Sequence, residues 1–224
     1  MEQVPRSNLE IFSEVYEKGL WGQSPEANDN FFSGAGTHDP ILVNVYQKVV
    51  SNFLATFSRK LDAVDLGCGD FTVGSKIRPL CRNYIACDVV DSLIERNQIK
   101  YADCDVDFRS IDAVTDELPP GEVVFVRQVF QHLSNHAISK VVAKIQRKYP
   151  IMIVTEHLPL WDEFVPNRDS PTGSSTRIIH EDGPSGVVLT ESPFNLELRR
   201  EIRLLDIFDQ GGYIRSHAYI LKTT

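Results

Sequence analysis

Residues 64–74, VDLGCGDFTVG, constrain the fold of this 224-residue chain more than any other segment. They place Gly67, Gly69 and Gly74 where a short apolar strand ends and a helical pattern begins. Glycine permits a tight turn and lets a ligand approach the bare backbone, while the first turn of a helix offers unpaired N–H groups to a polar or anionic ligand. The segment therefore predicts a strand-turn-helix unit that binds a cofactor.

Three classes of cofactor bind at turns of this kind, and the spacing of the glycines separates them. A dinucleotide-binding turn has the pattern GxGxxG, but Thr72 stands where its third glycine belongs. A phosphate-binding P-loop has Lys followed by Ser or Thr, whereas Ser75 precedes Lys76 in this chain. A site for NAD or for ATP is therefore disfavoured.

Asp88 stands at the end of the next predicted strand after Asp65. A carboxylate at that place can accept hydrogen bonds from both ribose hydroxyls of an adenosine. It would also repel a 2′-phosphate, which disfavours NADP. An Asp at the end of a strand can instead cap the following helix. The residues alone therefore do not decide whether Asp88 binds a ribose or caps the helix.

The rest of the chain shows short apolar runs that alternate with amphipathic helical patterns. This rhythm predicts a mostly parallel, Rossmann-like α/β sheet with helices on both faces. Two further apolar runs, joined by DQGG, predict a C-terminal antiparallel hairpin. The expected strands are 63–66, 84–87, 105–108, 123–126, 151–154, 198–208 and 213–221, and the expected helices are 8–19, 38–58, 72–80, 91–100 and 134–148.

The length of the chain predicts a single domain over residues 1–224. Its expected parts are an N-terminal helical cap with a cofactor-covering loop (1–60), a cofactor-binding core (61–157), an acceptor-side loop (158–195) and the hairpin (196–224). The third part is rich in proline and has no sustained periodicity. Long irregular stretches in compact domains are more often functional than filler, so this loop is expected to border the acceptor.

The acidic residue two places before the GxG turn, together with Asp88, resembles the cofactor motifs of class I S-adenosylmethionine-dependent methyltransferases. Motif by motif, this likeness covers residues 61–157. The chain is also similar to a bacterial subfamily with a WG…SGxGS entrance, an RDxxxHLS strand end and a PPF segment. Gln128 replaces the subfamily's Asp and Ser192 its first Pro, which puts in doubt any proton or metal role of that Asp. The matching stretches are WG at 21–22, SGAG at 33–36, DLGCGDF at 65–71, RQVFQHLS at 127–134 and SPF at 192–194.

The resemblance implies that the cofactor is S-adenosyl-L-methionine. In the family, the position of Asp112 usually accepts a hydrogen bond from the adenine amino group, and a Trp at the position of Trp21 closes over the cofactor. For Trp21, packing into the core is the alternative. The residues expected to bind the cofactor are Trp21, Asp65, Gly67, Cys68, Gly69, Asp88, Asp112, Ala113 and Arg127.

Methyl transfer from a sulfonium is an in-line displacement, so positioning of the two reactants dominates the catalysis. An acceptor hydroxyl would also gain from a general base. The candidates are His132, His157 and Asp169, with Glu156 as an acid-base candidate beside His157. His132 could equally be a packed histidine that orients its loop, and the residues alone do not decide among the candidates.

The loop over 158–195 is polar and of mixed charge, and Asn167 and Arg177 are further candidates for acceptor binding. This composition favours O-methylation of a sugar-like or otherwise hydroxylated metabolite. N-methylation of a small amine and non-catalytic binding of the cofactor are the alternatives. An NAD-dependent oxidoreductase or epimerase is disfavoured by the glycine spacing and by the absence of a YxxxK pair after the fourth strand.

The composition excludes several classes of partner. With 31 acidic and 23 basic residues, the formal net charge of -8 disfavours nucleic acid. No apolar run reaches the length of a bilayer span. The start of the chain, MEQVPR, lacks the basic and then apolar pattern of a secretory signal. A cytoplasmic protein without a membrane partner is predicted.

The four cysteines contain no CxxC pair, so reduced thiols are expected rather than a zinc site. The carboxylates form no evident cluster for a hard cation, and Gln128 removes one candidate ligand, so no metal is predicted. The expected partner is a small-molecule acceptor, and a homodimer is left open.

Overall fold

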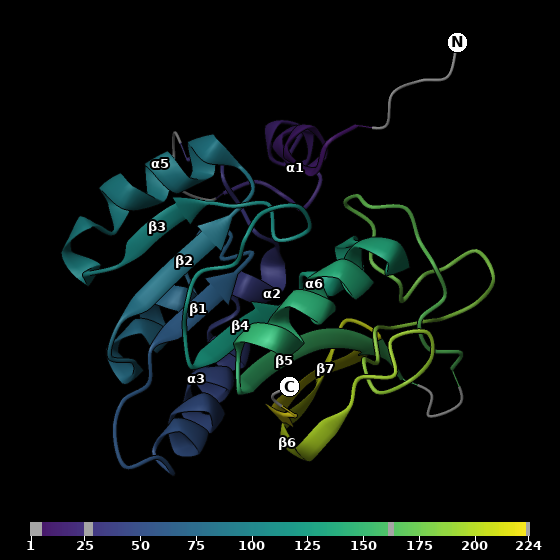
Figure 1. Cartoon of the computed structure of the whole chain (residues 1–224). Helices are drawn as coiled ribbons and strands as arrows, with labels where there is room; N and C mark the ends of the chain where they lie inside the picture. Colours follow the sequence, from purple (N-terminus) through teal and green to yellow (C-terminus); the bar gives the residue numbers. More distant parts are fainter. Residues whose placement is uncertain (1–5, 25–28, 161–163, 223–224) are drawn as a thin grey trace.

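The computed structural model describes residues 6–24, 29–160 and 164–222. Within that part of the chain the strands form one seven-stranded sheet, in the order β3-β2-β1-β4-β5-β7-β6 (Figure 1). The first five of these pair in parallel, whereas β7 runs antiparallel to both β5 and β6. The predicted fold class is therefore confirmed. The strands are β1 Ala63–Leu66, β2 Tyr84–Asp88, β3 Asp107–Ser110, β4 Val123–Arg127, β5 Ile151–Pro159, β6 Leu198–Asp209 and β7 Gly212–Leu221.

Helices cover both faces of this sheet. Side chains of β4 alternate between the two faces: Phe125 packs in the cluster that contains α3, and Val124 packs in the cluster that contains α6. Because both faces are buried, apolar residues follow one another in the central strands instead of alternating with polar ones, and the polar exceptions, such as Asp65 and Arg127, stand near the carboxyl ends. The helices are α1 Asn8–Glu17, α2 Ala35–His38, α3 Pro40–Leu54, α4 Gly74–Ile77, α5 Asp91–Lys100 and α6 Asn135–Lys148, with 3-10 turns η1 Arg78–Leu80, η2 Ala102–Cys104 and η3 Phe130–His132.

Side chains at the helix starts explain where the longer helices begin. Ser7 and Glu10 form a capping box at α1, Asp39 accepts hydrogen bonds from the first backbone N–H groups of α3, and Ser134 accepts one from Ala137 at the start of α6. Each supplies an acceptor to N–H groups that have no partner inside the helix. The cap of α6 agrees with its predicted start.

Several predicted elements have different bounds in the structure: the helices expected over 8–19 and 38–58 cover only Asn8–Glu17 and Pro40–Leu54, and three further elements differ as follows. β3 begins at Asp107, two residues late, because Asp105 is in the left-handed region at φ 52° and cannot continue a strand. The helix expected over 72–80 divides at Arg78 into α4 and the 3-10 turn η1. β5 extends to Pro159, because antiparallel pairing with β7 continues to the pair Pro159 and Gly212. Glu156 and His157 therefore lie within a strand.

The N-terminal helix α1 lies beyond the carboxyl ends of the parallel strands, over the turns that follow them (Figure 1). No helix among the described residues is long and apolar enough to cross a membrane. Residues 1–5, on which the absence of a signal pattern depends, lie outside the described residues.

Residues 164–197 contain no helix or strand. Asn167 organises this loop, with its side-chain amide donating to the carbonyls of Val188 and Ser192 and its Oδ1 accepting from the Val188 amide. Arg177 is 1% exposed and donates to Asn135 and to the carbonyls of Leu133 and Arg168. The loop is therefore held against the start of α6 by buried polar side chains.

Candidate active site

A pocket of about 380 Å³ lies at the carboxyl ends of the parallel strands. Its walls come from α1, α2, the turns after β1, β2, β3 and β4, strand β5 and the turn between β6 and β7. In open parallel sheets, ligands bind at this edge. All the residues expected to bind the cofactor line this pocket, as do His132 and His157, whereas Asp169 does not.

The glycine turn after β1 requires glycine on two counts. Gly67 and Gly69 have φ values of 70° and 55°, in the left-handed region that side chains disfavour. A Cβ on Gly67 would lie 2.5 Å from a methyl group of Val129, and a Cβ on Gly69 would lie 2.5 Å from the hydroxyl of Ser33. The turn therefore packs closely against the segments that follow β4 and precede α2.

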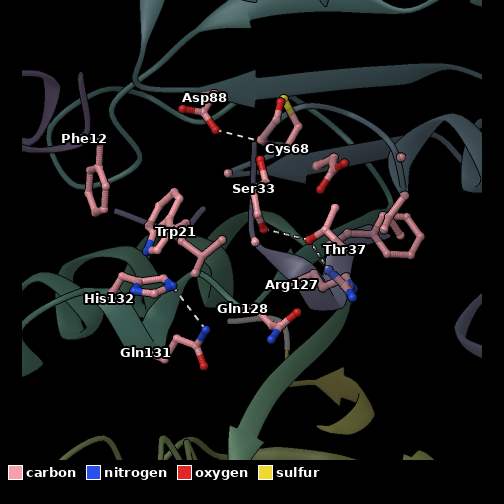
Figure 2. Close-up of a pocket in the computed structure, with 18 of the residues that line it drawn as sticks. Phe12, Trp21, Ser33, Thr37, Cys68, Asp88, Arg127, Gln128, Gln131 and His132 are labelled. Atoms are coloured by element: carbon pink, nitrogen blue, oxygen red, sulfur yellow. Dashed lines mark hydrogen bonds between the residues drawn. The ribbon is translucent and has the colours of Figure 1, made fainter. Parts of the chain in front are cut away.

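Asp88 is buried at one end of the pocket, beside Cys68 (Figure 2). Its Oδ2 accepts a hydrogen bond from the Gly69 amide at 3.0 Å, and its Oδ1 accepts one from the Val90 amide at 3.2 Å. Burial raises the pKa of Asp88, against the effect of these backbone donors. Each carboxylate oxygen has a second lone pair, so hydrogen bonds to a ligand are still open to Asp88.

Asp112 lies in the same pocket and already has two partners. The Nδ2 of Asn8 donates to both carboxylate oxygens of Asp112, at 3.0 and 3.1 Å, and the Val114 amide donates to Oδ1 at 2.8 Å. Asn8 belongs to α1, so this contact fastens the N-terminal helix to the turn after β3. An adenine amino group would have to share this carboxylate with Asn8.

Asp65 is 8% exposed, and its Oδ2 accepts a hydrogen bond from the Tyr84 hydroxyl at 3.0 Å. Burial raises the pKa of Asp65 to about 7. The nearby positive charge of Arg127 opposes this shift.

Arg127, the last residue of β4, is a partly buried cation whose hydrogen bonds are incomplete. Its guanidinium donates to Thr37 Oγ1 at 3.3 Å and to the Gly36 carbonyl at 3.4 Å, and it lies over the Tyr46 ring at 5.6 Å. Its Nε has no hydrogen-bond partner, and no carboxylate of the described chain is within ion-pair distance of it. Because a partly buried charge without an ionic partner is costly, this guanidinium is suited to an anionic group of a ligand.

Trp21 closes one side of the pocket, between α1 and the 158–195 loop. Its Nε1 donates to the Ser174 carbonyl at 3.0 Å, and its ring lies edge-on to Tyr16 and 4.8 Å from the ring of His132. The apolar face of the ring thus forms part of the pocket wall, while its N–H has a hydrogen-bond acceptor in the loop, as Trp N–H groups inside proteins usually do.

Asp70 does not line the pocket, but it fastens two of the segments that do, a role that its position in the sequence did not indicate. It is 1% exposed; its Oδ2 accepts from the Ser33 amide at 2.9 Å and lies 2.8 Å from His38 Nε2, and its Oδ1 accepts from the Thr72 amide. Burial acts to raise the pKa of Asp70, but these hydrogen bonds outweigh burial and hold it at about 2. Asp70 therefore anchors the loop before α2 to the glycine turn, a long-range contact that no local pattern signals.

His132 has both ring nitrogens engaged by the protein. Nδ1 lies 3.2 Å from the Ser175 carbonyl and must donate, so Nε2 carries the lone pair and accepts from the Gln131 side-chain amide at 3.2 Å (Figure 2). Burial lowers the pKa of His132 to about 4. His132 is therefore a neutral, packed histidine, and neither ring nitrogen is free to take a proton from a methyl-acceptor substrate.

A stability prediction follows from the pKa of His132. The unfolded chain protonates this histidine near its ordinary pKa of 6.5, but the folded chain does so only near 4, so stability is complete above pH 6.5 and decreases as the pH falls toward 4. We expect the parent to lose about 3 kcal/mol more than His132→Asn across this range, because the Asn amide keeps the donor to Ser175 but does not titrate. Urea unfolding of both proteins at pH 4 and pH 7 measures the difference. Equal losses of stability in the two proteins would show that the pKa of His132 is not lowered in the folded chain.

His157 differs from His132 in having one nitrogen available. Its Nε2 donates to the Asp209 carbonyl at 2.9 Å, and its Nδ1 has no hydrogen-bond partner in the described chain. Burial lowers the pKa of His157, against the effect of Asp209. His157 lines the pocket, so a neutral imidazole with a free lone pair borders the ligand space.

The other acid-base candidates, Glu156 and Asp169, form hydrogen bonds with backbone amides of the protein itself. Glu156 is 4% exposed and accepts hydrogen bonds from the amides of Phe130 and Gln131, and burial raises its pKa to about 8. Asp169 accepts from the amides of Asn135 and Ser170 at the start of α6. Neither residue lines the pocket, and the same is true of Asn167 and Arg177. The structure thus brings only His132 and His157 of the candidate bases to the pocket.

Three solved structures that share this fold are methyltransferases. The magnesium protoporphyrin IX methyltransferase of Synechocystis PCC 6803, with bound S-adenosylmethionine, has a TM-score of 0.59 at 13% identity and covers 98% of this chain and 100% of that chain. The N-methyltransferase NodS of Bradyrhizobium japonicum WM9, in complex with S-adenosylhomocysteine, has a TM-score of 0.61 at 10% identity and covers 93% and 98%. A S-adenosylmethionine-dependent methyltransferase of Leishmania major has a TM-score of 0.58 at 15% identity and covers 80% and 73%. At these identities the likeness establishes the fold.

No protein-family model matches the sequence, and no curated protein sequence matches it. The subfamily motifs of the sequence analysis therefore stay an expectation. Among the described residues, no three His, Cys, Asp or Glu side chains gather as a metal site.

Proposed function

We propose that this protein is an S-adenosylmethionine-dependent methyltransferase that acts on a small polar acceptor. One observation carries the proposal: the pocket gathers the glycine turn, the carboxylate of Asp88 and the unpaired guanidinium of Arg127 around one space. Two of these groups match polar parts of the cofactor: its ribose hydroxyls donate to carboxylates such as Asp88, and its methionine end carries a carboxylate that suits Arg127. The fold shared with methyltransferases supports the same reading.

In this proposal Asp88 holds the ribose hydroxyls and Arg127 pairs with the methionine carboxylate. Ala113 and its neighbour Asp112 border the adenine, and Asn8 reinforces that wall through its contact with Asp112. Trp21 separates the cofactor from solvent. Each of these roles uses a hydrogen-bonding group or surface that faces the pocket in the described chain.

When bound, the cofactor supplies an electrophilic methyl group on a sulfonium. The chain's own contribution is alignment, which lowers the barrier by about 7–11 kcal/mol at the extreme, together with a base that removes the acceptor's proton. We assign that base to His157, because the residue lines the pocket and its Nδ1 has no hydrogen-bond partner in the described chain, whereas the nitrogens of His132 are both bonded.

The acceptor is proposed to carry a hydroxyl or an amino group. The preference for a sugar-like hydroxyl depended on the mixed charges of the 158–195 loop, but Asn167, Asp169 and Arg177 bond to the protein itself and lie outside the pocket wall. Selection among acceptors is instead assigned to the polar side chains around His157. A non-catalytic cofactor-binding protein, the second candidate, is distinguished by whether any methyl group is transferred.

Cofactor choice is directly testable by calorimetry. We expect S-adenosylmethionine and S-adenosylhomocysteine to bind with micromolar Kd values, and NAD and ATP to produce no binding heat, because the turn lacks the spacing that holds a pyrophosphate. The Asp103→Asn variant, altered at an exposed residue away from the pocket, is the matched control. Tight NAD binding without S-adenosylhomocysteine binding would contradict the proposal.

A further inference from the structure

The turn between β6 and β7 forms the far end of the pocket. Antiparallel pairing of β5 with β7 runs to Pro159 and Gly212, and this places the turn beside His157. The Asp209 carbonyl accepts the His157 Nε2–H at 2.9 Å, and both Asp209 and Gln210 line the pocket. A segment at the C-terminal end of the chain therefore completes a wall that begins at the glycine turn.

The Asp209 side chain brings an uncompensated negative charge to this wall. Its carboxylate has no hydrogen bond and no ion pair in the described chain, and its Oδ2 lies 3.8 Å from the point that a Cβ on Gly36 would occupy. Arg127, the one Lys or Arg among the described residues of the pocket wall, donates to Thr37 and Gly36 instead. Asp209 is partly buried, so its charge is less screened than that of an open surface residue.

Gln128 adds a second unpaired polar group to the same place. Its side-chain amide has no partner in the described chain, its Oε1 lies 4.0 Å from the same Cβ point on Gly36, and the side chain lies at the opposite end of the pocket from Asp88 (Figure 2). Gln128 has φ 54°, a strained conformation for a residue with a side chain. Such strain is commonly retained at binding sites, where it directs a side chain toward a ligand.

Together these residues present three hydrogen-bond acceptors to the end of the pocket: the Asp209 carboxylate, the Gln128 Oε1 and the free Nδ1 of His157. A protonated amine offers three N–H donors, a positive charge and no acceptor, whereas a hydroxyl offers one donor and no charge. Charge-assisted hydrogen bonds are about twice as strong as neutral ones. The site therefore complements an ammonium group better than it complements a hydroxyl group.

We propose that the methyl acceptor is an amine, bound as its ammonium ion by the carboxylate of Asp209 and oriented by Gln128 and His157. This inference rests on the proposed methyltransferase function and adds the acceptor class to it. A proton passes from the ammonium nitrogen to Nδ1 of His157, which frees the nitrogen lone pair. The lone pair forms the new N–C bond as the C–S bond breaks, and the electrons of that bond stay on sulfur, which leaves as a neutral thioether.

The test measures binding of matched pairs of small molecules to the protein saturated with S-adenosylhomocysteine. The pairs are butylamine with 1-butanol, cyclohexylmethylamine with cyclohexylmethanol, and glucosamine with glucose, each titrated by ligand-observed NMR. We expect at least one amine to bind at least about 10-fold more tightly than its alcohol, because a charge-assisted bond is worth that factor or more. An amine that binds should also be converted when S-adenosylmethionine replaces the product.

Two variants locate the effect. Asp209→Asn keeps a turn-forming residue and the backbone carbonyl that His157 uses, so it should weaken amine binding about 10–100-fold while S-adenosylhomocysteine binding and Tm stay near the parent values. Gln128→Glu adds a second carboxylate of the same shape and should strengthen amine binding about 2–5-fold. Asp103→Asn is the control and should change neither.

The proposal is overturned if every alcohol binds as tightly as its amine, if no amine binds to the S-adenosylhomocysteine complex, or if Asp209→Asn keeps the preference for amines. Failure of S-adenosylhomocysteine to bind in the first place would instead contradict the methyltransferase function. The two failures are therefore read from separate titrations.

Discussion

His157→Ala is expected to lower kcat about 10²–10⁴-fold while leaving S-adenosylhomocysteine affinity within about 2-fold of the parent, the range that loss of a general base produces. The physical reason is the free Nδ1, since the other ring nitrogen is held by the Asp209 carbonyl. Transfer of a labelled methyl group to the tightest-binding amine of the panel measures kcat. Because burial lowers the pKa of His157, kcat should stay level near pH 7 and fall only on the acidic side of the ordinary histidine pKa.

His157→Gln separates the base from a merely structural role. A glutamine side-chain amide can still donate to the Asp209 carbonyl, but it has no nitrogen that accepts a proton near neutral pH. If His157 is the base, the Gln variant should be as inactive as the Ala variant and should lose the acidic limb of the pH profile. Recovery of activity by Gln would show that His157 only positions the turn between β6 and β7.

Asp88→Asn is expected to weaken S-adenosylhomocysteine binding about 10²-fold or more. Its carboxylate oxygens already accept from Gly69 and Val90, and their remaining lone pairs are the ones offered to the ribose. An amide has one acceptor oxygen and places N–H donors where acceptors are needed, and each lost charge-assisted bond is worth about 1.5–3 kcal/mol. Calorimetric titration measures the change in Kd, which scales tenfold for each 1.4 kcal/mol.

Thermal melts without ligand accompany this titration, because the Asn variant also disturbs the bonds from Gly69 and Val90. Asp91→Asn, three residues along and outside the pocket wall, is the matched control and should bind like the parent. Asn fills a helix cap as well as Asp does. Parent-like binding by Asp88→Asn would therefore mean that Asp88 serves the backbone alone and that the ribose is held elsewhere.

Most of the fold could be predicted from the sequence because its signals are local. The apolar runs at Ala63–Leu66 and Val123–Arg127 and the amphipathic stretch of α6 depend on the side-chain periods of strands and helices, which neighbouring residues define. The bound that differed most depends on a distant partner. β5 was expected to end at Val154, but its pairing with β7 continues the ladder to Pro159.

The residues expected at the cofactor end share this local character. Gly67 and Gly69 have the left-handed φ values that the turn requires. Asp88 stands at the end of a parallel strand, so its position at the ligand-binding edge of the sheet could be predicted. The structure gathers them all at one pocket. The contact of Asp70 with Ser33 and His38 could not be predicted from the sequence, because it joins segments more than thirty residues apart.

The acceptor end was decided by tertiary structure alone. In the sequence, His132 and His157 each stand near the end of a strand, and nothing nearby distinguishes them. Packing makes the difference: Ser175 and Gln131 occupy both nitrogens of His132, whereas the Asp209 carbonyl takes only one nitrogen of His157. Asp169 was a third candidate from the sequence, but in the structure its carboxylate accepts a hydrogen bond from the Asn135 amide at the start of α6.

The sequence by itself determined the parallel sheet, the cofactor turn and the carboxylate beside it, because backbone conformation and strand ends are properties of short segments. Only the tertiary structure decided that Arg127 is a partly buried cation without a carboxylate partner, that Asp209 reaches the pocket and that His157 keeps a free lone pair. Whether a polar side chain faces a ligand depends on which of its hydrogen bonds the protein already satisfies. Those partners come from chain segments that no local pattern connects.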